Sequence, residues 1–270
     1  MTRLWREGGK ENRPTVNDIS PRMGKILHLV RAQGFVSIEA LAERFKVTPQ
    51  TVRRDINALC DQDLLRRYHG GAGLPSSVEN APYGARQVMN LTEKSAIAYE
   101  LAKHIPNRAS LFINIGTTTE AVAQALLQHE GLRIITNNLN VASILSGNPD
   151  FEVILAGGVV RSRDRGIVGE ATIDLIRQFK VDYGIIGISC VEEDGTLLDY
   201  DYREVRVAQA IIGNSRKVIL VADHSKFNRT AMVRLGHISQ VDMLITDKRP
   251  LASMVKLLAD GAVELAVAGR

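Results

Sequence analysis

The stretch SIEALAERFKVTPQTVRRDINAL, residues 37–59, decides the fold of the N-terminal part of the chain. Its first half predicts a short helix that begins after a capping serine, Ser37, and ends near Lys46. Thr48 and Pro49 then provide a second cap and a proline at the first helical position, where the missing amide hydrogen costs nothing. A tight turn therefore separates two helices.

The flanking sequence adds a third helix and a hairpin. Upstream, before Gly34, apolar residues recur at helical spacing, at Met23, Ile26, Leu27 and Val30. Downstream, LLRRYHGG at residues 64–71 is short and basic and ends in paired glycines, which is typical of a wing that lies against a DNA backbone. Three helices, a tight turn and a basic hairpin together predict a small winged helix-turn-helix domain over residues 21–73.

The helix that begins at Pro49 is expected to present a polar face to DNA. Val52, Ile56 and Leu59 form its predicted buried stripe. The outward side chains are of the types that read base edges and bind phosphates. The expected DNA contacts come from this helix, the two caps and the hairpin, and are Ser37, Thr48, Gln50, Thr51, Arg53, Arg54, Asn57, Arg66, Arg67 and His69.

Composition is compatible with a DNA-binding protein of two domains. The chain has 270 residues, 45% of them hydrophobic, which suits a small domain joined to a larger one. Residues 1–85 hold 13 Lys/Arg against 9 Asp/Glu, whereas the remainder holds 21 of each, so the excess positive charge that favours DNA phosphates is N-terminal. We expect a cytoplasmic protein with no membrane partner, because there is neither an apolar run of about 18 residues nor a secretory signal.

The rest of the chain predicts a leader, a linker and an α/β domain. Residues 1–20 have the composition of a disordered leader, and residues 74–91 are rich in Pro, Ser, Gly and Asn, as linkers are. Over residues 92–270, short β-rich runs such as LFINI and KVILVAD alternate with helical patterns. This alternation predicts a parallel sheet with helices on both faces.

Polar loops follow several of the predicted strands. Ligands bind at the carboxyl ends of the strands in open α/β sheets, so these loops are expected to share one site. Gly116–Thr119 opens a helix with free amides and hydroxyls, which suits an anion, and Lys226 adds a positive charge. Residues 92–270 therefore form a predicted sensing domain for a small phosphorylated metabolite. The loop residues expected to contact it are Gly116, Thr117, Thr118, Thr119, Thr136, Asn137, Gly157, Gly158, Asp223 and Lys226.

Several other chemistries lack their sequence signatures. Neither a G-x-x-x-x-G-K-[ST] loop nor a G-x-G-x-x-G fingerprint is present, which argues against ATP and dinucleotides, and we expect no cofactor. The six histidines are scattered without metal-ligand spacing, so we expect no metal. Cys60 and Cys190 lie far apart and are predicted to be reduced thiols. Nothing resembles a nucleophile elbow, and no catalytic residue is predicted.

The motifs of both domains resemble the DeoR family of sugar-metabolism repressors. Residues 37–59 and the following LRRYHGGA resemble the family's winged helix-turn-helix, while INIGTTT, ITNN, LAGG, GIVGE and ADHSKF occur in the family's order through its sensor domain. The resemblance runs from Pro21 to the C-terminus. It implies a transcriptional repressor whose binding to operator DNA is weakened by a phosphorylated metabolite, and its GIVGE motif adds Gly169 and Glu170 to the expected effector contacts.

Further motifs narrow the effector that the resemblance implies. GLPSS, TNNLNVA, RSRDRGIVGEATID and DYREVR are similar to those of family members that control glycerol 3-phosphate metabolism, which implies glycerol 3-phosphate as inducer, with another sugar phosphate as the alternative. Asn114 departs from the family, in which an acidic residue is usual at that position. Since palindromic operators are read by two-fold symmetric proteins, we expect a homo-oligomer, a dimer or a tetramer, bound to double-stranded DNA.

Two other functions compete with this interpretation. The sensor domain also resembles sugar-phosphate isomerases of the ribose-5-phosphate isomerase type, whose glutamate base matches Glu204. The stretch Gly187–Cys190 lacks the acidic residues that those enzymes carry there, although Asp199 and Asp201 lie near Glu204 in the sequence. We therefore expect Glu204 to contact the effector without catalysing a reaction. An architectural DNA-binding protein would leave the polar loops unexplained.

Overall fold

The computed structural model describes residues 19–269 with the exception of residues 34, 63, 69 and 74–79. The chain divides into two compact units, residues 1–75 and residues 76–270. The predicted leader lies outside the described residues up to residue 18.

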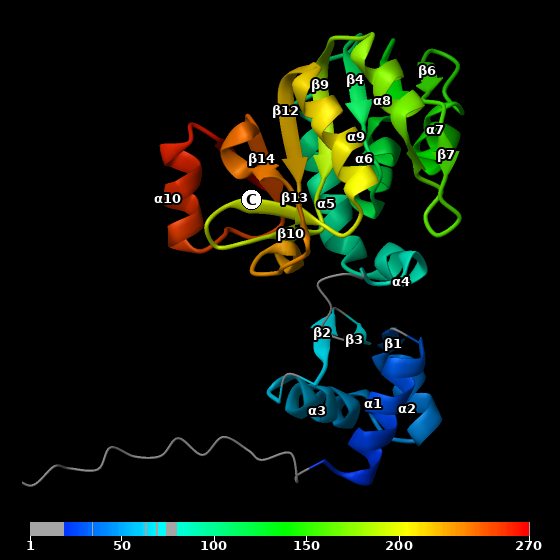
Figure 1. The fold of residues 1–270 in the computed structure, drawn as a ribbon, viewed down its shortest axis with the longest axis vertical. Helices are drawn as coiled ribbons and strands as arrows, with labels where there is room; N and C mark the ends of the chain where they lie inside the picture. The colour runs from blue at the N-terminus through cyan, green and yellow to red at the C-terminus, as the bar shows by residue number, and fades with distance from the viewer. Residues whose placement is uncertain (1–18, 34, 63, 69, 74–79, 270) are drawn as a thin grey trace, which may run out of the picture. The chain divides into compact units, whose positions relative to one another are not determined.

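The first unit has the elements of a winged helix-turn-helix (Figure 1). Its three strands form an antiparallel sheet in the order β1-β3-β2. Together these elements confirm the predicted domain of three helices and a hairpin. They are α1 (Pro21–Gln33), β1 (Phe35–Ser37), α2 (Ile38–Phe45), α3 (Pro49–Cys60), β2 (Arg66–Tyr68) and β3 (Gly71–Gly73).

The turn between α2 and α3 forms for the reasons that the sequence indicates. The hydroxyl of Ser37 caps α2 by accepting from the backbone N–H of Ala40. Lys46 ends this helix in the left-handed conformation, with φ of 52°. Thr48 caps α3 by accepting from the N–H of Thr51. The side chains that close the small core are buried on all three helices and include Ile26, Val30, Leu41, Val52, Ile56 and Leu59.

The second unit is built on a seven-stranded sheet in the order β15-β14-β12-β9-β4-β5-β6, and every neighbouring pair in it is parallel. Its strands are β4 (Ser110–Ile113), β5 (Arg133–Thr136), β6 (Glu152–Leu155), β9 (Val181–Gly187), β12 (Ser215–Val221), β14 (Met243–Thr246) and β15 (Glu264–Val267). The helices are α4 (Tyr83–Val88), α5 (Leu91–Ala102), α6 (Thr117–Leu126), α7 (Leu139–Leu145), α8 (Glu170–Arg177), α9 (Tyr202–Gly213), α10 (Ala252–Asp260) and the short turns η2 (His224–Lys226) and η3 (Ile238–Gln240).

Both faces of this sheet are covered by helices, as predicted (Figure 1). Successive residues of a strand point to opposite faces, so Leu111 and Ile113 pack with α5, α6 and α7, while Phe112 packs in the cluster formed by α8, α9 and α10. The two hydrophobic cores lie on either side of one parallel sheet. Within the described residues, no helix is long and apolar enough to cross a bilayer.

Two features of this unit differ from the sequence-based expectation. Short antiparallel strands β10 (Cys190–Val191), β11 (Thr196–Asp199) and β13 (Val233–His237) form a second small sheet, and β7 (Val159–Val160) pairs with β8 (Ile167–Val168). Helix α4 lies within the predicted linker, and it contacts α6. The linker-like composition of residues 74–91 does not predict α4, because tertiary contacts rather than helical propensity stabilise so short a helix.

Candidate functional site

The polar face of α3 is the candidate DNA-binding surface. The predicted stripe of Val52, Ile56 and Leu59 is at most 1% exposed. Arg53 and Arg54 are exposed on the opposite side, and within the described part of the chain neither makes a hydrogen bond or an ion pair. Two unpaired guanidinium groups on an exposed helix face are available to phosphates and base edges.

The other predicted DNA contacts combine exposure with structural contacts. Gln50 is exposed, and Asn57 accepts a hydrogen bond from the guanidinium of Arg67, at 3.1 Å, which ties α3 to the hairpin. Arg66 is half-buried, and His69 lies outside the described residues. The hydroxyls of Ser37, Thr48 and Thr51 already take part in the helix caps. Contact of all these residues with DNA stays a prediction.

One residue that sequence reasoning missed sets the position of α3. Asp55 is 8% exposed on the inner side of the helix and accepts two hydrogen bonds from the guanidinium of Arg22 on α1, at 2.6 and 3.0 Å. A bidentate pair of this kind fixes orientation as well as distance. The signal was present in the sequence as a carboxylate on an otherwise apolar stripe.

The candidate effector site is a cavity in two adjoining parts at the carboxyl ends of β4, β9 and β12. Arg86, Asp199 and Glu204 line both parts. The first part also contains the loop before α6, with Gly116, Thr117 and Thr118, together with Ser189 and Lys226. The second part extends to residues 80–83 and to Arg163, Asp164 and Tyr200. Five predicted effector contacts therefore meet in one place, and these are Gly116, Thr117, Thr118, Glu204 and Lys226.

The loop before α6 offers backbone amides to an anion. Helix α6 begins after Gly116, and no side chain caps it, which leaves its first N–H groups available at the positive end of the helix. Thr119 points inward instead, and its hydroxyl donates to the carbonyls of Asn114 and Gly116, both at 2.8 Å. The amide oxygen of Asn114 accepts the N–H of Gly187 at 3.0 Å. Asn114 therefore holds this loop against β9 through an acceptor oxygen, as a carboxylate can.

The turn η2 places Lys226 in the cavity. The carboxylate of Asp223 caps this turn by accepting from the N–H of Ser225, and it also accepts from the amide of Asn90 at 2.8 Å. Burial lowers the pKa of Lys226, and the neighbouring Asp223 opposes that shift. Burial and the charge of Lys226 also lower the pKa of Lys94, to about 8. Lys226 lines the cavity, whereas the buried Lys94 lies outside the lining and donates to the carbonyl of Arg86.

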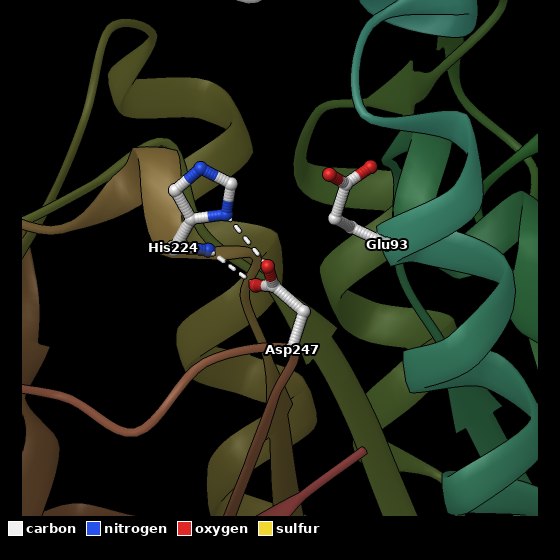
Figure 2. Close-up of side chains that lie close together, drawn as sticks. All are labelled: Glu93, His224 and Asp247. Carbon is white, nitrogen blue, oxygen red and sulfur yellow. Dashed lines mark hydrogen bonds and ion pairs between the residues drawn. The ribbon is translucent and has the colours of Figure 1, made fainter. Parts of the chain in front are cut away.

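The other side of η2 is held by the group of side chains in Figure 2. Asp247 accepts from both the backbone N–H and the ring Nδ1 of His224, each at 2.6 Å. Glu93 faces this pair, and the three residues offer ligand atoms within 4.8 Å of one another, which is a set that a divalent cation can use. Lys248 Nζ, however, lies 3.4 Å from His224 Nε2 and adds positive charge. The expectation that the protein binds no metal stays a prediction.

The buried Asp199 and the half-buried Glu204 line the cavity together with Arg86 and Lys226. The carboxylate of Asp199 accepts from the hydroxyl of Ser189 at 3.0 Å, and burial raises the pKa of Asp199. Burial and the neighbouring Asp199 raise the pKa of Glu204 to about 7, against the attraction of Arg161, whose Nη2 lies 2.8 Å from Glu204. The loop Gly187–Cys190 has no carboxylate of its own, but β11 brings Asp199 beside it. These carboxylates are acceptors for the hydroxyl groups of a ligand.

Sequence reasoning missed the wall of the cavity that precedes α5. Asn80 donates to Ser189 at 3.0 Å, and the hydroxyl of Tyr83 donates to Glu120 at 2.8 Å. Arg86 follows on α4, with its side chain 17% exposed. The available signal was that Arg86 is the single Lys or Arg between residues 68 and 93.

Two polar residues of the predicted site lie outside the cavity lining, at the end of β5. The hydroxyl of Thr136 donates to the carbonyl of Ile113 at 2.7 Å, and Nδ2 of Asn137 donates to the carbonyl of Ile167 at 2.9 Å. Both side chains are 1% exposed. They join β5 to neighbouring segments, and direct contact with a ligand stays a prediction.

The Gly157–Gly158 and Gly169–Glu170 motifs also lie outside the cavity lining. The carbonyl of Gly157 accepts from Thr172 at 2.7 Å. Gly158 has a φ of 148°, and a Cβ there would lie 2.3 Å from the Thr172 hydroxyl, which only glycine avoids. Glu170 is exposed and pairs with Arg206 at 3.0 Å. These contacts link the motifs to α8 and α9, and direct contact of the motifs with the effector stays a prediction.

Comparison with known proteins assigns both units. Residues 22–78 match the DeoR-like helix-turn-helix domain, and residues 89–248 match the DeoR C terminal sensor domain. The class is thus a helix-turn-helix protein with an attached sensor domain. The chain belongs to the DeoR family.

Its curated relatives match almost end to end. The chain is 55% identical to the glycerol-3-phosphate regulon repressor of Escherichia coli (strain K12), over 90% of this chain and 97% of that protein. The protein of the same name from Haemophilus influenzae is also 55% identical, over 86% and 90%. Among solved structures, ribose 5-phosphate isomerase A from Neisseria gonorrhoeae is similar with a TM-score of 0.37 and 15% identity, over 50% of this chain and 52% of that one. A likeness so distant says nothing about activity.

Proposed function

We propose that this protein is a transcriptional repressor of genes for glycerol 3-phosphate metabolism and that glycerol 3-phosphate releases it from its operator. The observation that carries the proposal is the 55% identity, over 90% of the chain, to relatives named glycerol-3-phosphate regulon repressor. The match extends through both the helix-turn-helix and the sensor domain, so it includes the candidate DNA surface and the candidate cavity.

The cavity suits a phosphate monoester that also carries hydroxyl groups. The phosphate would lie at the amides of Gly116–Thr118 and beside Lys226, where partial and full positive charges meet. The hydroxyl groups would then lie toward Asp199, whose carboxylate accepts hydrogen bonds and already accepts one from the hydroxyl of Ser189. A ligand with an anion at one end and hydroxyl donors at the other matches this division of charge. A different sugar phosphate would satisfy the same chemistry and is the alternative effector.

The DNA complex would use the exposed face of α3 in the major groove. Arg53 and Arg54 would contact phosphates or guanine edges, and Gln50 and Asn57 would contact base edges. Because operators for such domains are usually palindromic, the active form would be a homo-oligomer. Effector binding would shift the sensor domain between two states that differ in how paired DNA-binding domains fit the half-sites.

The protein is proposed to bind its effector without converting it. Its relatives are named as repressors, and glycerol 3-phosphate has no carbonyl group to isomerise. Glu204, the residue that matches an isomerase base, is paired with Arg161. Incubation with ribose 5-phosphate at high protein concentration is expected to yield no ribulose 5-phosphate, and enzyme-like turnover would contradict this assignment.

The deciding experiment measures affinity for operator DNA at fixed salt while glycerol 3-phosphate and, in parallel, several sugar phosphates are titrated. We expect glycerol 3-phosphate to weaken operator binding and the other sugar phosphates to leave it unchanged. In Lys226→Ala, operator binding without ligand should equal that of the natural protein, while release should need roughly 10- to 100-fold more ligand, since a charged hydrogen bond is lost. If only another phosphorylated compound releases the protein from DNA, that compound and not glycerol 3-phosphate is the effector. If Lys226→Ala responds normally to ligand, the phosphate does not bind beside Lys226.

A further inference from the structure

Helix α4 is the first helix after the boundary between the two units, and it forms one wall of the effector cavity. Just before it, the amide of Asn80 donates to the hydroxyl of Ser189. On the helix, the hydroxyl of Tyr83 donates to Glu120 of α6, and Arg86 lines both parts of the cavity. Residues 80–86, which follow the boundary between the two units, therefore form part of the wall of the effector site.

Arg86 is held by contacts that it can exchange at small cost. Its Nε donates to the carbonyl of Ala81 at 3.1 Å, and its Nη2 lies 3.7 Å from Oδ2 of Asp164. Asp164 already has a closer partner, because Nη2 of Arg161 lies 2.7 Å from the same oxygen. A guanidinium at 3.7 Å is beyond good hydrogen-bond distance and adds little to a carboxylate so paired.

Arg161, by contrast, forms close ion pairs with three carboxylates. Its guanidinium lies 2.7 Å from Asp164, 3.2 Å from Asp201 and 2.8 Å from Glu204, and its side chain is 5% exposed. Removing it would leave the buried Asp164 and the half-buried Asp201 and Glu204 with less charge compensation. An anion that enters the cavity therefore leaves Arg161 in place and attracts Arg86.

The position of Arg86 fits a phosphate that lies at Lys226. Arg86 lines the same part of the cavity as Gly116, Thr117 and Lys226. Two phosphate oxygens match the planar fork of a guanidinium, and a dianion attracts it more strongly than one backbone carbonyl does. A bidentate contact of Nε and Nη2 of Arg86 with the phosphate would replace the bond from Nε to the carbonyl of Ala81.

We propose that Arg86 binds the effector phosphate and, by releasing Ala81, couples effector binding to the segment that leads to the DNA-binding domain. The proposal rests on the proposed function of the cavity. Lys94 donates to the carbonyl of Arg86 and so anchors the C-terminal side of α4. The conformational change that follows release of the Ala81 carbonyl is therefore expected at residues 80–82. These residues lead along the chain to the DNA-binding domain. Arg86 is thus a coupling residue, whereas Lys226 is only a binding residue.

The test compares Arg86→Ala with Lys226→Ala and the natural full-length protein. Binding of glycerol 3-phosphate is measured by calorimetry, and operator affinity is measured without ligand and at ligand concentrations that saturate each variant. Saturating glycerol 3-phosphate is expected to lower the operator affinity of the natural protein by roughly 5- to 150-fold, the usual range of allosteric coupling. When Lys226→Ala is saturated with ligand, its operator affinity is expected to fall as far as that of the natural protein. When Arg86→Ala is saturated, its operator affinity is expected to stay within about twofold of the ligand-free value.

Arg86→Lys covers the case in which the alanine variant binds too little ligand to be saturated. Lysine keeps the positive charge but lacks the planar guanidinium group. We therefore expect measurable ligand binding, with a smaller loss of operator affinity at saturation than in the natural protein. Ligand-free operator affinity and thermal unfolding of each variant check that the protein is folded. Full release of either Arg86 variant at saturation would overturn the coupling role.

The two proposals fail in different ways. If the natural protein binds its operator equally with and without glycerol 3-phosphate, the proposed effector is wrong, and the same series is repeated with the phosphate that does release DNA. If the natural protein responds and either Arg86 variant shows the same full release at saturation, only the coupling role of Arg86 is wrong.

Discussion

The polar face of α3 and the effector cavity differ in how the chain builds them. The α3 face comes from one helix of 12 residues, capped by its own Thr48. The cavity collects side chains from residues 80–86, from the loop after β4, from β11 and α9, and from η2. A surface within one helix follows from local periodicity, whereas a cavity drawn from distant segments depends on the whole sheet. The two sites should therefore respond separately to substitution.

The largest expected effect comes from a substitution that destabilises the hydrophobic core of one domain and leaves the core of the other domain intact. Ile56→Ala removes a side chain that is 1% exposed beneath the α3 face and is expected to lower the free energy of unfolding of the DNA-binding domain by about 2–5 kcal/mol. Scanning calorimetry should show one transition shifted, and glycerol 3-phosphate binding should be unchanged. Ile97→Ala, in the core of the sensor domain, is the matched control with the opposite outcome. A joint loss of both transitions would show that the units do not fold independently.

A smaller effect is expected from removing one cation of the α3 face. Arg54→Ala should weaken operator binding by roughly 1–3 kcal/mol if the side chain reads a base, with effector affinity unchanged. Arg177→Ala removes the same charge from the exposed surface of α8 and controls for net charge. Fluorescence anisotropy at fixed salt measures both variants. Equal losses for Arg54→Ala and Arg177→Ala would mean that charge alone, and not the α3 face, determines affinity.

The smallest expected effect is the pH dependence of the cavity. With a pKa of about 7, Glu204 is mainly protonated below pH 7 and gains a negative charge above it. Because a phosphate dianion favours the protonated form, ligand affinity should fall as the pH rises from about 6 to 8, by up to about tenfold for each unit that binding shifts the pKa. Calorimetry of Glu204→Gln supplies the control, because it removes the titration of Glu204 and keeps that of the phosphate, near pH 6, and that of Lys94, near pH 8. Parallel pH profiles for the two proteins would exclude Glu204 as the titrating group.

The comparison also shows where reasoning from sequence succeeds. Ser37, Thr48 and Pro49 gave the limits of the two helices because each acts on a neighbouring backbone group. The glycine and threonines before α6 were recognised for the same reason, since a strand followed by such a loop opens a helix with free amides. The alternation of short apolar runs with helical patterns likewise predicted the parallel sheet.

The cavity shows where such reasoning stops. Gly157, Gly158 and Gly169 were predicted to contact the effector; in the structure the first two contact Thr172 of α8 and the third precedes this helix, so their contact with a ligand stays a prediction. Arg86 lay in a segment with the composition of a linker, and Asp199 lay at the end of the short strand β11, which pairs with β10. Whether a polar residue at a strand end faces a ligand or another loop depends on contacts that are distant in the sequence.

The sequence by itself determined the winged helix-turn-helix, the parallel sheet and the polar helix start at Gly116, because these depend on spacing and on neighbouring residues. Only the tertiary structure decided which charges meet. It placed Arg86 and Asp199 beside Lys226, and it committed Arg161 to three carboxylates. The physical reason is that electrostatic interaction depends on distance and burial, and both are set by the packing of segments that lie far apart along the chain.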